Sequence, residues 1–361
     1  MTTNFLSKYY RAATAVSAMT IATVLSGCAT APTAPVTATP AAPVVTIHTI
    51  FDTPEQTALK ARMTLQDRLY RIAAPLLVKN PQLCRATARK LLGFTAKNKH
   101  SFTPEFTDAA ERSFGLDERL QIMGVLAGGG AEKAGIRPGD LLLAVDGKTM
   151  PEGQNAERIA AGILGPIIGN KSNVQLTIMR GTSIMEVSVP LTLACAFGIE
   201  LGNSDNVNAY SDGHRVMITR GMMNFARSDT QLAYVIAREM AHSALGHAER
   251  LRMSATLGSI IDNLIRVHPD LSTMGGRAGV KPFPQDVDAA ADTLSLYMLA
   301  RAGYDIEDAP GFWQRLAAEY PATTLNGYTA IHPATAYRMN VMAKILPIVK
   351  TKLLNRSRLS P

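Results

Sequence analysis

The sequence has no cluster of Lys and Arg, although its 37 basic residues exceed its 29 acidic ones and give a formal net charge of +8. It also has no stretch in which basic and aromatic residues alternate. A nucleic-acid-binding protein typically carries such a patch or stripe. The basic balance therefore indicates a solvated surface, and nucleic acid is not an expected partner.

The chain has no long apolar run at its start. A membrane-spanning helix needs about 20 apolar residues, and the apolar stretch Ala12–Leu25 is shorter. It follows Lys8 and Arg11, and small residues come directly after it. A charged lead, a short apolar core and small residues are typical of a secretory signal peptide.

The letters LSGC at Leu25–Cys28 resemble the lipobox of bacterial lipoproteins. The resemblance implies a signal peptide over residues 1–27, cleavage before Cys28 and lipid on that residue; a plain secretory signal is the alternative. Ala29 follows, with no aspartate there, so the resemblance implies an outer-membrane anchor with the folded part facing the periplasm. Residues 28–52 are rich in Ala, Thr and Pro, which predicts an extended tether.

Cysteine is scarce: apart from Cys28, the sequence has only Cys84 and Cys195. Both would lie in an oxidising compartment in the cell envelope. We therefore expect a disulfide that joins the N-terminal segment to the start of the last domain. Two buried free thiols are the alternative.

From Thr53 onwards, apolar residues recur at helical spacing. Thr53 can cap the helix, Pro54 suits its first position, and Gln56 completes a capping box. Asn80 and the proline after it should end this helix. Residues 53–112 are therefore predicted to form an N-terminal helical segment that docks on the folded part and carries no chemistry of its own.

The stretch of residues 120–150 predicts two strands around a Gly-rich turn and a short helix. Within it, the letters AEKAGIRPGDLLLAVDG resemble those of a PDZ domain. The resemblance implies a β-rich domain over residues 113–193 that binds protein or peptide ends by adding them as a strand at a sheet edge. It also implies a carboxylate-binding loop before the first strand, near Phe114, Gly115 and Leu116.

Residues 237–247 read AREMAHSALGH and differ by one letter from the H-E-x-x-H motif of zinc proteases. Positions i and i+4 of a helix lie on one face, so that motif brings two imidazoles to one zinc. The glutamate between them activates the metal-bound water. A helix is predicted here, because Ser228 can cap it and Gln231 completes a capping box.

The surroundings of this helix resemble peptidase family M48, the zinc metallopeptidases that include the HtpX and CAAX-prenyl endopeptidases. The resemblance rests on NAY, ITRGMM, the GH after the helix, DAAAD, ARAGYD and HPATAYR, in that order. It implies an α+β protein whose mainly helical peptidase domain, over residues 196–350, is zincin-like (gluzincin) with a small sheet. The PDZ domain would precede it.

The resemblance also implies roles for individual residues and one Zn²⁺ per chain. Glu239 matches the catalytic base, His242 the second zinc ligand, Asp288 the carboxylate ligand and Asp292 the aspartate four positions later. In the stretch HPATAYR, His332 and Arg338 match residues near the site. The strand predicted at His214–Thr219 matches one beside the cleft, where a substrate could pair.

Arg238 departs from the family pattern, because this position carries the first histidine ligand. Arginine has no available lone pair and stays charged, so it cannot ligate zinc. Asp288 departs more mildly, since it is one methylene shorter than the glutamate of the family. Two of the three protein ligands therefore differ.

Two functions remain open. In the first, the protein is a zinc metalloendopeptidase of the envelope that cleaves or handles envelope proteins in protein quality control. His242, Asp288 and a recruited His332 would hold the metal. If His332 is not a ligand, His332 or Arg338 would stabilise the oxyanion. In the second, Arg238 makes it an inactive pseudopeptidase that binds proteins through its PDZ domain and cleft.

The position of the Arg238 side chain discriminates between these functions. Its guanidinium could reach across the metal site and pair with Asp288, in one or two charge-assisted hydrogen bonds. Alternatively, it could swing out to solvent and leave the site to metal. His247 lies five residues beyond His242, about 140° around an ideal helix, so we expect it to pack or hydrogen-bond rather than share that metal.

Overall fold

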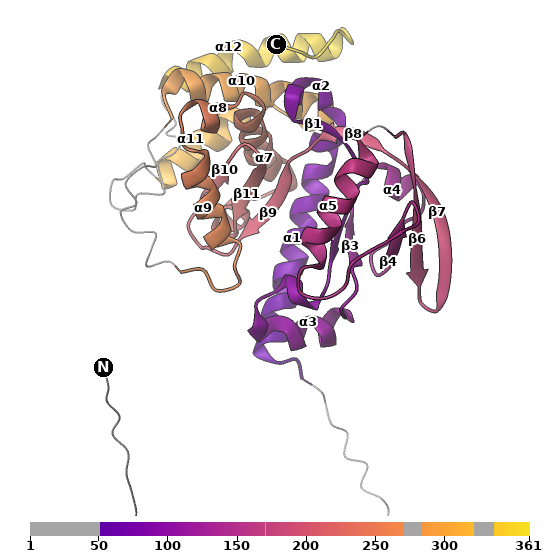
Figure 1. The fold of residues 1–361 in the computed structure, drawn as a ribbon. Helices are drawn as coiled ribbons and strands as arrows, with labels where there is room; N and C mark the ends of the chain where they lie inside the picture. Colours follow the sequence, from indigo (N-terminus) through magenta and orange to yellow (C-terminus); the bar gives the residue numbers. More distant parts are fainter. Residues whose placement is uncertain (1–50, 170, 271–282, 321–335) are drawn as a thin grey trace, which may run out of the picture. The chain divides into compact units, whose positions relative to one another are not determined.

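The computed structural model describes residues 51–169, 171–270, 283–320 and 336–361 (Figure 1). The predicted signal peptide, the tether up to residue 50 and Cys28 lie outside the described residues, and so does His332. No helix within the described ranges is both long and apolar enough to span a membrane.

Helix α1 (Pro54–Lys79) begins and ends where the sequence predicts. Thr53 Oγ1 accepts a hydrogen bond from the backbone N–H of Gln56 at 3.2 Å, and Gln56 Oε1 accepts one from the N–H of Thr53 at 2.9 Å. The two bonds satisfy orphan donors of the first turn. Its buried face includes Leu59, Leu69 and Leu76. Through this face α1 packs into the protein, as predicted.

Residues 53–112 contain strands as well as helices. After α1 come α2 (Pro81–Cys84), β1 (Ala88–Leu91), β2 (Phe94–Lys97) and α3 (Thr107–Phe114), with 3-10 turns at Arg85–Thr87, Lys99–Ser101 and Pro104–Phe106. Neither strand was expected, because each has only four residues and no clear alternation.

The larger sheet is antiparallel and has the order β2-β3-β4-β6-β7, with β5 on β4. Its other elements are β3 (Gln121–Val125), α4 (Gly130–Lys133), β4 (Leu141–Val145), β5 (Lys148–Thr149), α5 (Ala156–Ile168), β6 (Asn173–Arg180) and β7 (Ser183–Pro190). Alternate residues of β6 are buried, namely Val174, Leu176 and Ile178, so one face of the sheet covers its own core. Since β2 pairs with β3, the sheet begins before the predicted boundary at residue 113.

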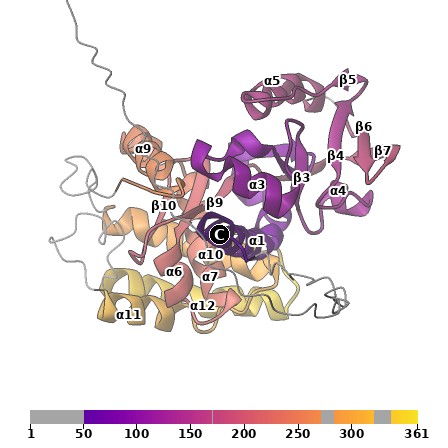
Figure 2. The same cartoon turned by 90° about the horizontal axis from the view of Figure 1, so that it is seen from below.

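The smaller sheet has the order β10-β11-β9. Its strands are β9 (Gly198–Gly202), β10 (Ala209–Ser211) and β11 (Arg215–Thr219), and β8 (Thr192–Cys195) pairs with β1. The helices are α6 (Arg220–Phe225), α7 (Asp229–Ala244), α8 (His247–Arg250), α9 (Ser254–Leu264), α10 (Gln285–Ala302), α11 (Ala309–Glu319) and α12 (Ala336–Leu354). Helix α7 packs on β10 and β11 and also on α10, which in turn packs on α12 (Figure 2).

The prediction that a substrate could pair with the strand at His214–Thr219 is wrong. This strand is β11, and it is the middle strand of the small sheet. It pairs in parallel with β9 and antiparallel with β10, so both of its edges are already used. Within the described residues, β10 is the edge strand next to α7.

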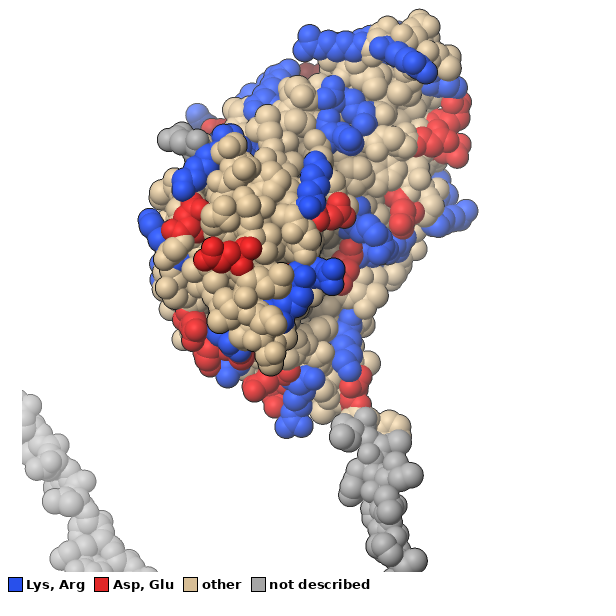
Figure 3. Space-filling view, turned by 90° about the vertical axis from the view of Figure 1, so that its right-hand side faces the viewer, with Lys and Arg blue, Asp and Glu red and all other residues tan. Residues whose placement is uncertain are grey.

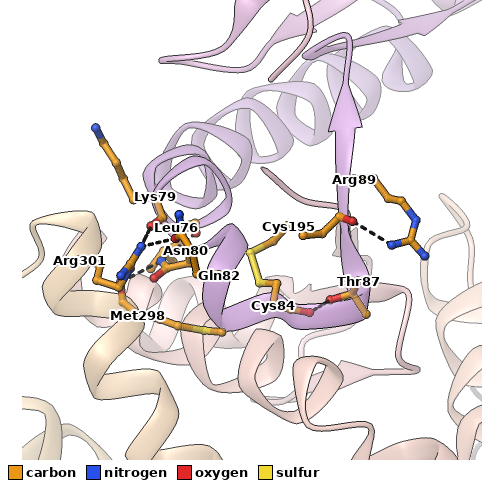
Figure 4. The surroundings of a disulfide bond; sticks show 11 residues. Leu76, Lys79, Asn80, Gln82, Cys84, Thr87, Arg89, Cys195, Met298 and Arg301 are labelled. Atoms are coloured by element: carbon orange, nitrogen blue, oxygen red, sulfur yellow. Dashed lines mark hydrogen bonds between the residues drawn. A yellow bond between two sulfur atoms is a disulfide. The ribbon is translucent and has the colours of Figure 1, made fainter. Parts of the chain in front are cut away.

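Cys84 and Cys195 form a disulfide, and both are fully buried (Figure 4). It joins the end of α2 to the end of β8 across 111 residues of sequence. Beside it, Asn80 Nδ2 donates a hydrogen bond to the carbonyl oxygen of Met298, on α10, at 3.0 Å. The C-terminal end of α1 is thus tied to the rest of the fold by a covalent bond and a hydrogen bond.

Candidate active site

Helix α7 carries the motif residues into the interior. Ser228 caps it, and its Oγ accepts a hydrogen bond from the N–H of Gln231 at 3.2 Å. The side chains of Arg238, Glu239 and His242 are each 2% exposed or less. Charged groups at this depth need partners; the facing helix provides them for Arg238 and His242, and the small sheet provides one for Glu239.

Helix α10 supplies two buried carboxylates from its first two turns. Asp288 and Asp292 are four residues apart, so they lie on one face of the helix, and both have 0% exposure. Asp288 lies in the first turn of α10, where the positive end of the helix dipole favours a carboxylate. Since α10 packs on α7, this face meets the motif residues.

The Arg238 guanidinium lies between these two carboxylates. Its Nη2 donates a hydrogen bond to Asp288 Oδ1 at 2.8 Å, and its Nε lies 2.9 Å from Asp292 Oδ1. The predicted pairing with Asp288 is therefore present, and the alternative, a side chain turned to solvent, is excluded. Arg238 does not bind Asp288 through two hydrogen bonds, because the guanidinium divides its contacts between two carboxylates.

Arg338 and Trp313 complete this cluster. Arg338 on α12 donates to Asp292 through Nε at 2.7 Å and through Nη2 at 2.9 Å, and its side chain is fully buried. The ring of Trp313 lies 4.8 Å from the Arg238 guanidinium carbon and 5.8 Å from that of Arg338, within cation–π range. Arg338 therefore holds Asp292 in place, and these contacts do not support the predicted role in stabilising an oxyanion.

The electrostatics keep the Arg238 guanidinium charged. Burial alone would lower the pKa of Arg238, but the carboxylates of Asp288, Asp292 and Glu239 outweigh it, so its pKa lies above its ordinary value. For Arg338, burial dominates and the nearby Arg238 charge adds to it, so its pKa is lowered. Two guanidiniums and two aspartates thus form a compact ionic cluster.

His242 also faces Asp288. Its Nε2 lies 3.2 Å from Asp288 Oδ1, the same oxygen that Arg238 binds. Its Nδ1 lies 2.9 Å from Nδ1 of His247, in hydrogen-bond contact. The expected hydrogen-bonding role of His247 is confirmed, but the ideal-helix angle was wrong, because α7 ends at Ala244 and Gly246 turns the chain with φ +66°.

Glu239 contacts the small sheet. Ser211 Oγ, at the end of β10, donates a hydrogen bond to Glu239 Oε2 at 2.8 Å. The carboxylate thus lies beside the edge strand of the sheet.

The site residues that the structure describes do not fit a zinc ion. A zinc held by His242 and Asp288 would contact each at about 2.0–2.2 Å. Asp288 Oδ1 instead accepts a hydrogen bond from Arg238, a fixed cation that has no lone pair and repels a second cation. Among the described residues, no group of three or more His, Cys, Asp or Glu side chains is arranged to hold a metal.

The segment predicted as a carboxylate-binding loop does not suit an anion. Phe114 ends α3, and Gly115 is its left-handed cap with φ +66°. The C-terminal end of a helix presents carbonyl oxygens and a negative dipole. Leu116 is buried in an apolar cluster with Leu59 and Phe106, so these surroundings do not favour the predicted carboxylate-binding role.

Three contacts of the site were not predicted from the sequence. Ser211 on Glu239 and Trp313 over the two arginines come from segments without a motif, so no signal in the sequence indicated them. For His247, the glycine before it was the available signal, because a left-handed Gly ends a helix and redirects the chain.

A cavity of about 610 Å³ lies between α1, β2 and β9. It is lined by Glu200, Arg62 and Lys97 among others. Burial raises the pKa of Glu200, although Lys97 and Arg62 act in the opposite direction. The folded state therefore disfavours the charged form of this carboxyl.

We expect Glu200→Gln to raise the melting temperature at pH 8 and to leave it nearly unchanged at pH 4. A raised pKa in the folded state means that stability falls as the pH rises through the two pKa values. Below the unfolded pKa of about 4.3 the carboxyl is protonated in both states, so no gain remains. Melting curves across this pH range test it, and equal shifts at both ends would contradict the assignment.

The comparisons with known proteins agree with this architecture. Residues 184–346 match the model of peptidase family M48, and residues 121–164 match that of a PDZ domain. The mitochondrial metalloendopeptidase OMA1 of Arabidopsis thaliana is 29% identical over 147 residues, which are 39% of this chain and 30% of that protein.

Two bacterial relatives also match about a third of this chain. The beta-barrel assembly-enhancing protease of Escherichia coli (strain K12) is 26% identical over 136 residues, 33% of this chain and 28% of that protein. The putative beta-barrel assembly-enhancing protease of Vibrio cholerae is 30% identical over 131 residues, 32% of this chain and 27% of that protein. The chain spans less than a third of the length of these relatives. It carries a peptidase family M48 domain together with a PDZ domain.

Proposed function

We propose that this protein is a metal-free pseudopeptidase of the bacterial cell envelope, which binds protein segments without cutting them. Relatives named for β-barrel assembly support the envelope, as do the predicted lipobox and the disulfide. Anchoring of Cys28 to the outer membrane is part of the same proposal.

One observation carries the loss of catalysis. The guanidinium of Arg238 contacts Asp288 and Asp292 at 2.8 and 2.9 Å in a fully buried site. It thus cross-links α7 and α10, the same two helices that a zinc ion held by His242 and Asp288 would join. The ionic cluster supplies the cation that buried aspartates need, so the fold has no need of a metal.

The binding function rests on two sheet edges. In the larger sheet, β2 is an edge strand, and adding a peptide as a further strand is a known mode of PDZ recognition. In the smaller sheet, the edge strand β10 ends at Ser211, which contacts Glu239. We propose that extended segments of envelope proteins bind at these edges.

The zinc content of the full chain, purified without added metal or chelator, tests the proposal. We expect well under one zinc per chain and no peptide hydrolysis. Arg238→His removes the competing cation and restores an imidazole one helical turn from His242, so this variant should bind zinc and melt at a higher temperature when zinc is added. Arg68→His, on the exposed face of α1, is the matched control for zinc binding by a surface histidine.

The second candidate is an active zinc metalloendopeptidase. It is favoured by the retention of Glu239 and by the 3.2 Å approach of His242 to Asp288. Near-stoichiometric zinc in the unaltered protein, together with peptide hydrolysis that Glu239→Gln abolishes, would establish this candidate and exclude a pseudopeptidase.

A further inference from the structure

The outer face of α12 combines exposed apolar and basic side chains. Tyr337 and Ile348 are each 46% exposed, and Leu354 is 83% exposed. Lys344, between them in sequence, is also exposed. The opposite face of the helix is buried through Arg338, Met342 and Val349, so α12 is anchored on the protein and presents its other face outwards.

The segment from Ala336 to Pro361 contains six basic residues and no Asp or Glu. Arg338 is buried against Asp292, Lys350 pairs with Glu307, and Lys352 lies over the Tyr297 ring at 4.9 Å. The other three, Lys344, Arg356 and Arg358, have no carboxylate partner within the described part of the chain. Their charge is available to an anionic partner.

The surface view agrees with this distribution. At the upper end of the molecule, where α12 lies in Figure 1, Lys and Arg side chains are set among uncharged surface (Figure 3). Exposed basic and exposed apolar side chains on one helix supply the two attractions that bind a helix to an anionic membrane surface, charge and apolar burial. A protein partner without dense negative charge would leave these cations uncompensated.

We propose that α12 and the residues after it form a membrane-docking face that binds anionic phospholipid headgroups. Lys344, Arg356 and Arg358 would contact the phosphates. Ile348 and Leu354 would enter the boundary between headgroups and acyl chains. The face would hold the folded part against the bilayer, independently of any lipid on Cys28.

Binding of the Cys28→Ser protein without residues 1–27 to vesicles tests this face in the absence of the predicted lipid and signal peptide. We expect it to sediment with vesicles of phosphatidylethanolamine and phosphatidylglycerol, less so as salt increases, and not with phosphatidylcholine vesicles. In this background, the triple variant Lys344→Glu, Arg356→Glu and Arg358→Glu should bind at least about 100-fold more weakly, at about fivefold for each basic residue lost. Ile348→Ser with Leu354→Ser should also weaken binding.

The matched control is Lys133→Glu, Lys148→Glu and Arg158→Glu, which makes the same charge change at exposed positions of the larger sheet and its helices. It should keep most of the binding. The proposal is overturned if the two triple variants lose binding equally, if phosphatidylcholine vesicles bind as well, or if no vesicles bind. If the triple variant at Lys344, Arg356 and Arg358 still binds vesicles, the proposal is also overturned, and the exposed face of α12 would then bind a protein partner. Unchanged melting temperatures would show that all variants fold.

Discussion

Replacing Arg238 with methionine should lower the free energy of unfolding by about 3–5 kcal/mol, which is the usual cost of removing one partner from a buried ion pair. Methionine has similar length, so little volume is lost, and the effect comes from charge. Asp288 and Asp292 are both fully buried. Without the guanidinium, Asp288 would keep the His242 imidazole at 3.2 Å, and Asp292 would keep Arg338.

Arg68→Met is the matched control for this prediction. Arg68 on α1 pairs with Asp229 at 2.8 Å, the same distance as Arg238 to Asp288, but the side chains of that pair are 32% and 50% exposed. An exposed ion pair contributes about 0–1 kcal/mol. Chemical denaturation should therefore show a much smaller loss in the free energy of unfolding for Arg68→Met than for Arg238→Met. Because the two pairs have the same N–O distance, the difference would come from burial.

A double variant, Arg238→Met with Asp288→Asn, isolates the pair itself. The double variant should lose less free energy of unfolding than the sum of the two single variants. With asparagine at position 288, no buried carboxylate is left there without the Arg238 cation. Additive costs, or an Arg238→Met cost as small as that of Arg68→Met, would contradict the role of Arg238 as the replacement for a metal.

The sequence predicted part of this site for a clear physical reason. Spacing on one helix places Glu239 and His242, and the lengths of Arg and Asp made a pairing between Arg238 and Asp288 plausible. The sharing of Arg238 between Asp288 and Asp292 could not be predicted, because it depends on how α10 packs on α7. The engagement of Arg338 with Asp292 depends in the same way on α12.

The fold shows the same division between local and tertiary information. The capping box at Thr53 and Gln56 is encoded within four residues, and α1 begins where it predicts. The strand β2 becomes regular only by pairing with β3, and its residues Phe94–Lys97 carry no alternation that reveals it. The predicted carboxylate-binding loop was placed before β3, because the sequence did not reveal that β2 precedes β3 in the larger sheet.

Removing the disulfide should produce the second large effect. In the double variant Cys84→Ala with Cys195→Ala, we expect the free energy of unfolding to fall by about 4–5 kcal/mol. The bond closes a loop of 111 residues, and the chain-entropy model assigns a loop of that length about 4.7 kcal/mol. Both cysteines have 0% exposure, so the mild loss of packing at two alanines adds to this cost.

The experiment belongs in the Cys28→Ser background, so that the reductant acts on a single bond. Oxidised and reduced forms of that protein should unfold at clearly different denaturant concentrations, and the Ala pair should match the reduced form and ignore the reductant. Because the disulfide joins α2 to β8 beside the contact of Asn80 with α10, reduction should also loosen the C-terminal end of α1, which hydrogen exchange can measure. Identical unfolding of the oxidised and reduced protein would contradict the prediction. The disulfide would then not restrict the unfolded chain as the chain-entropy model requires.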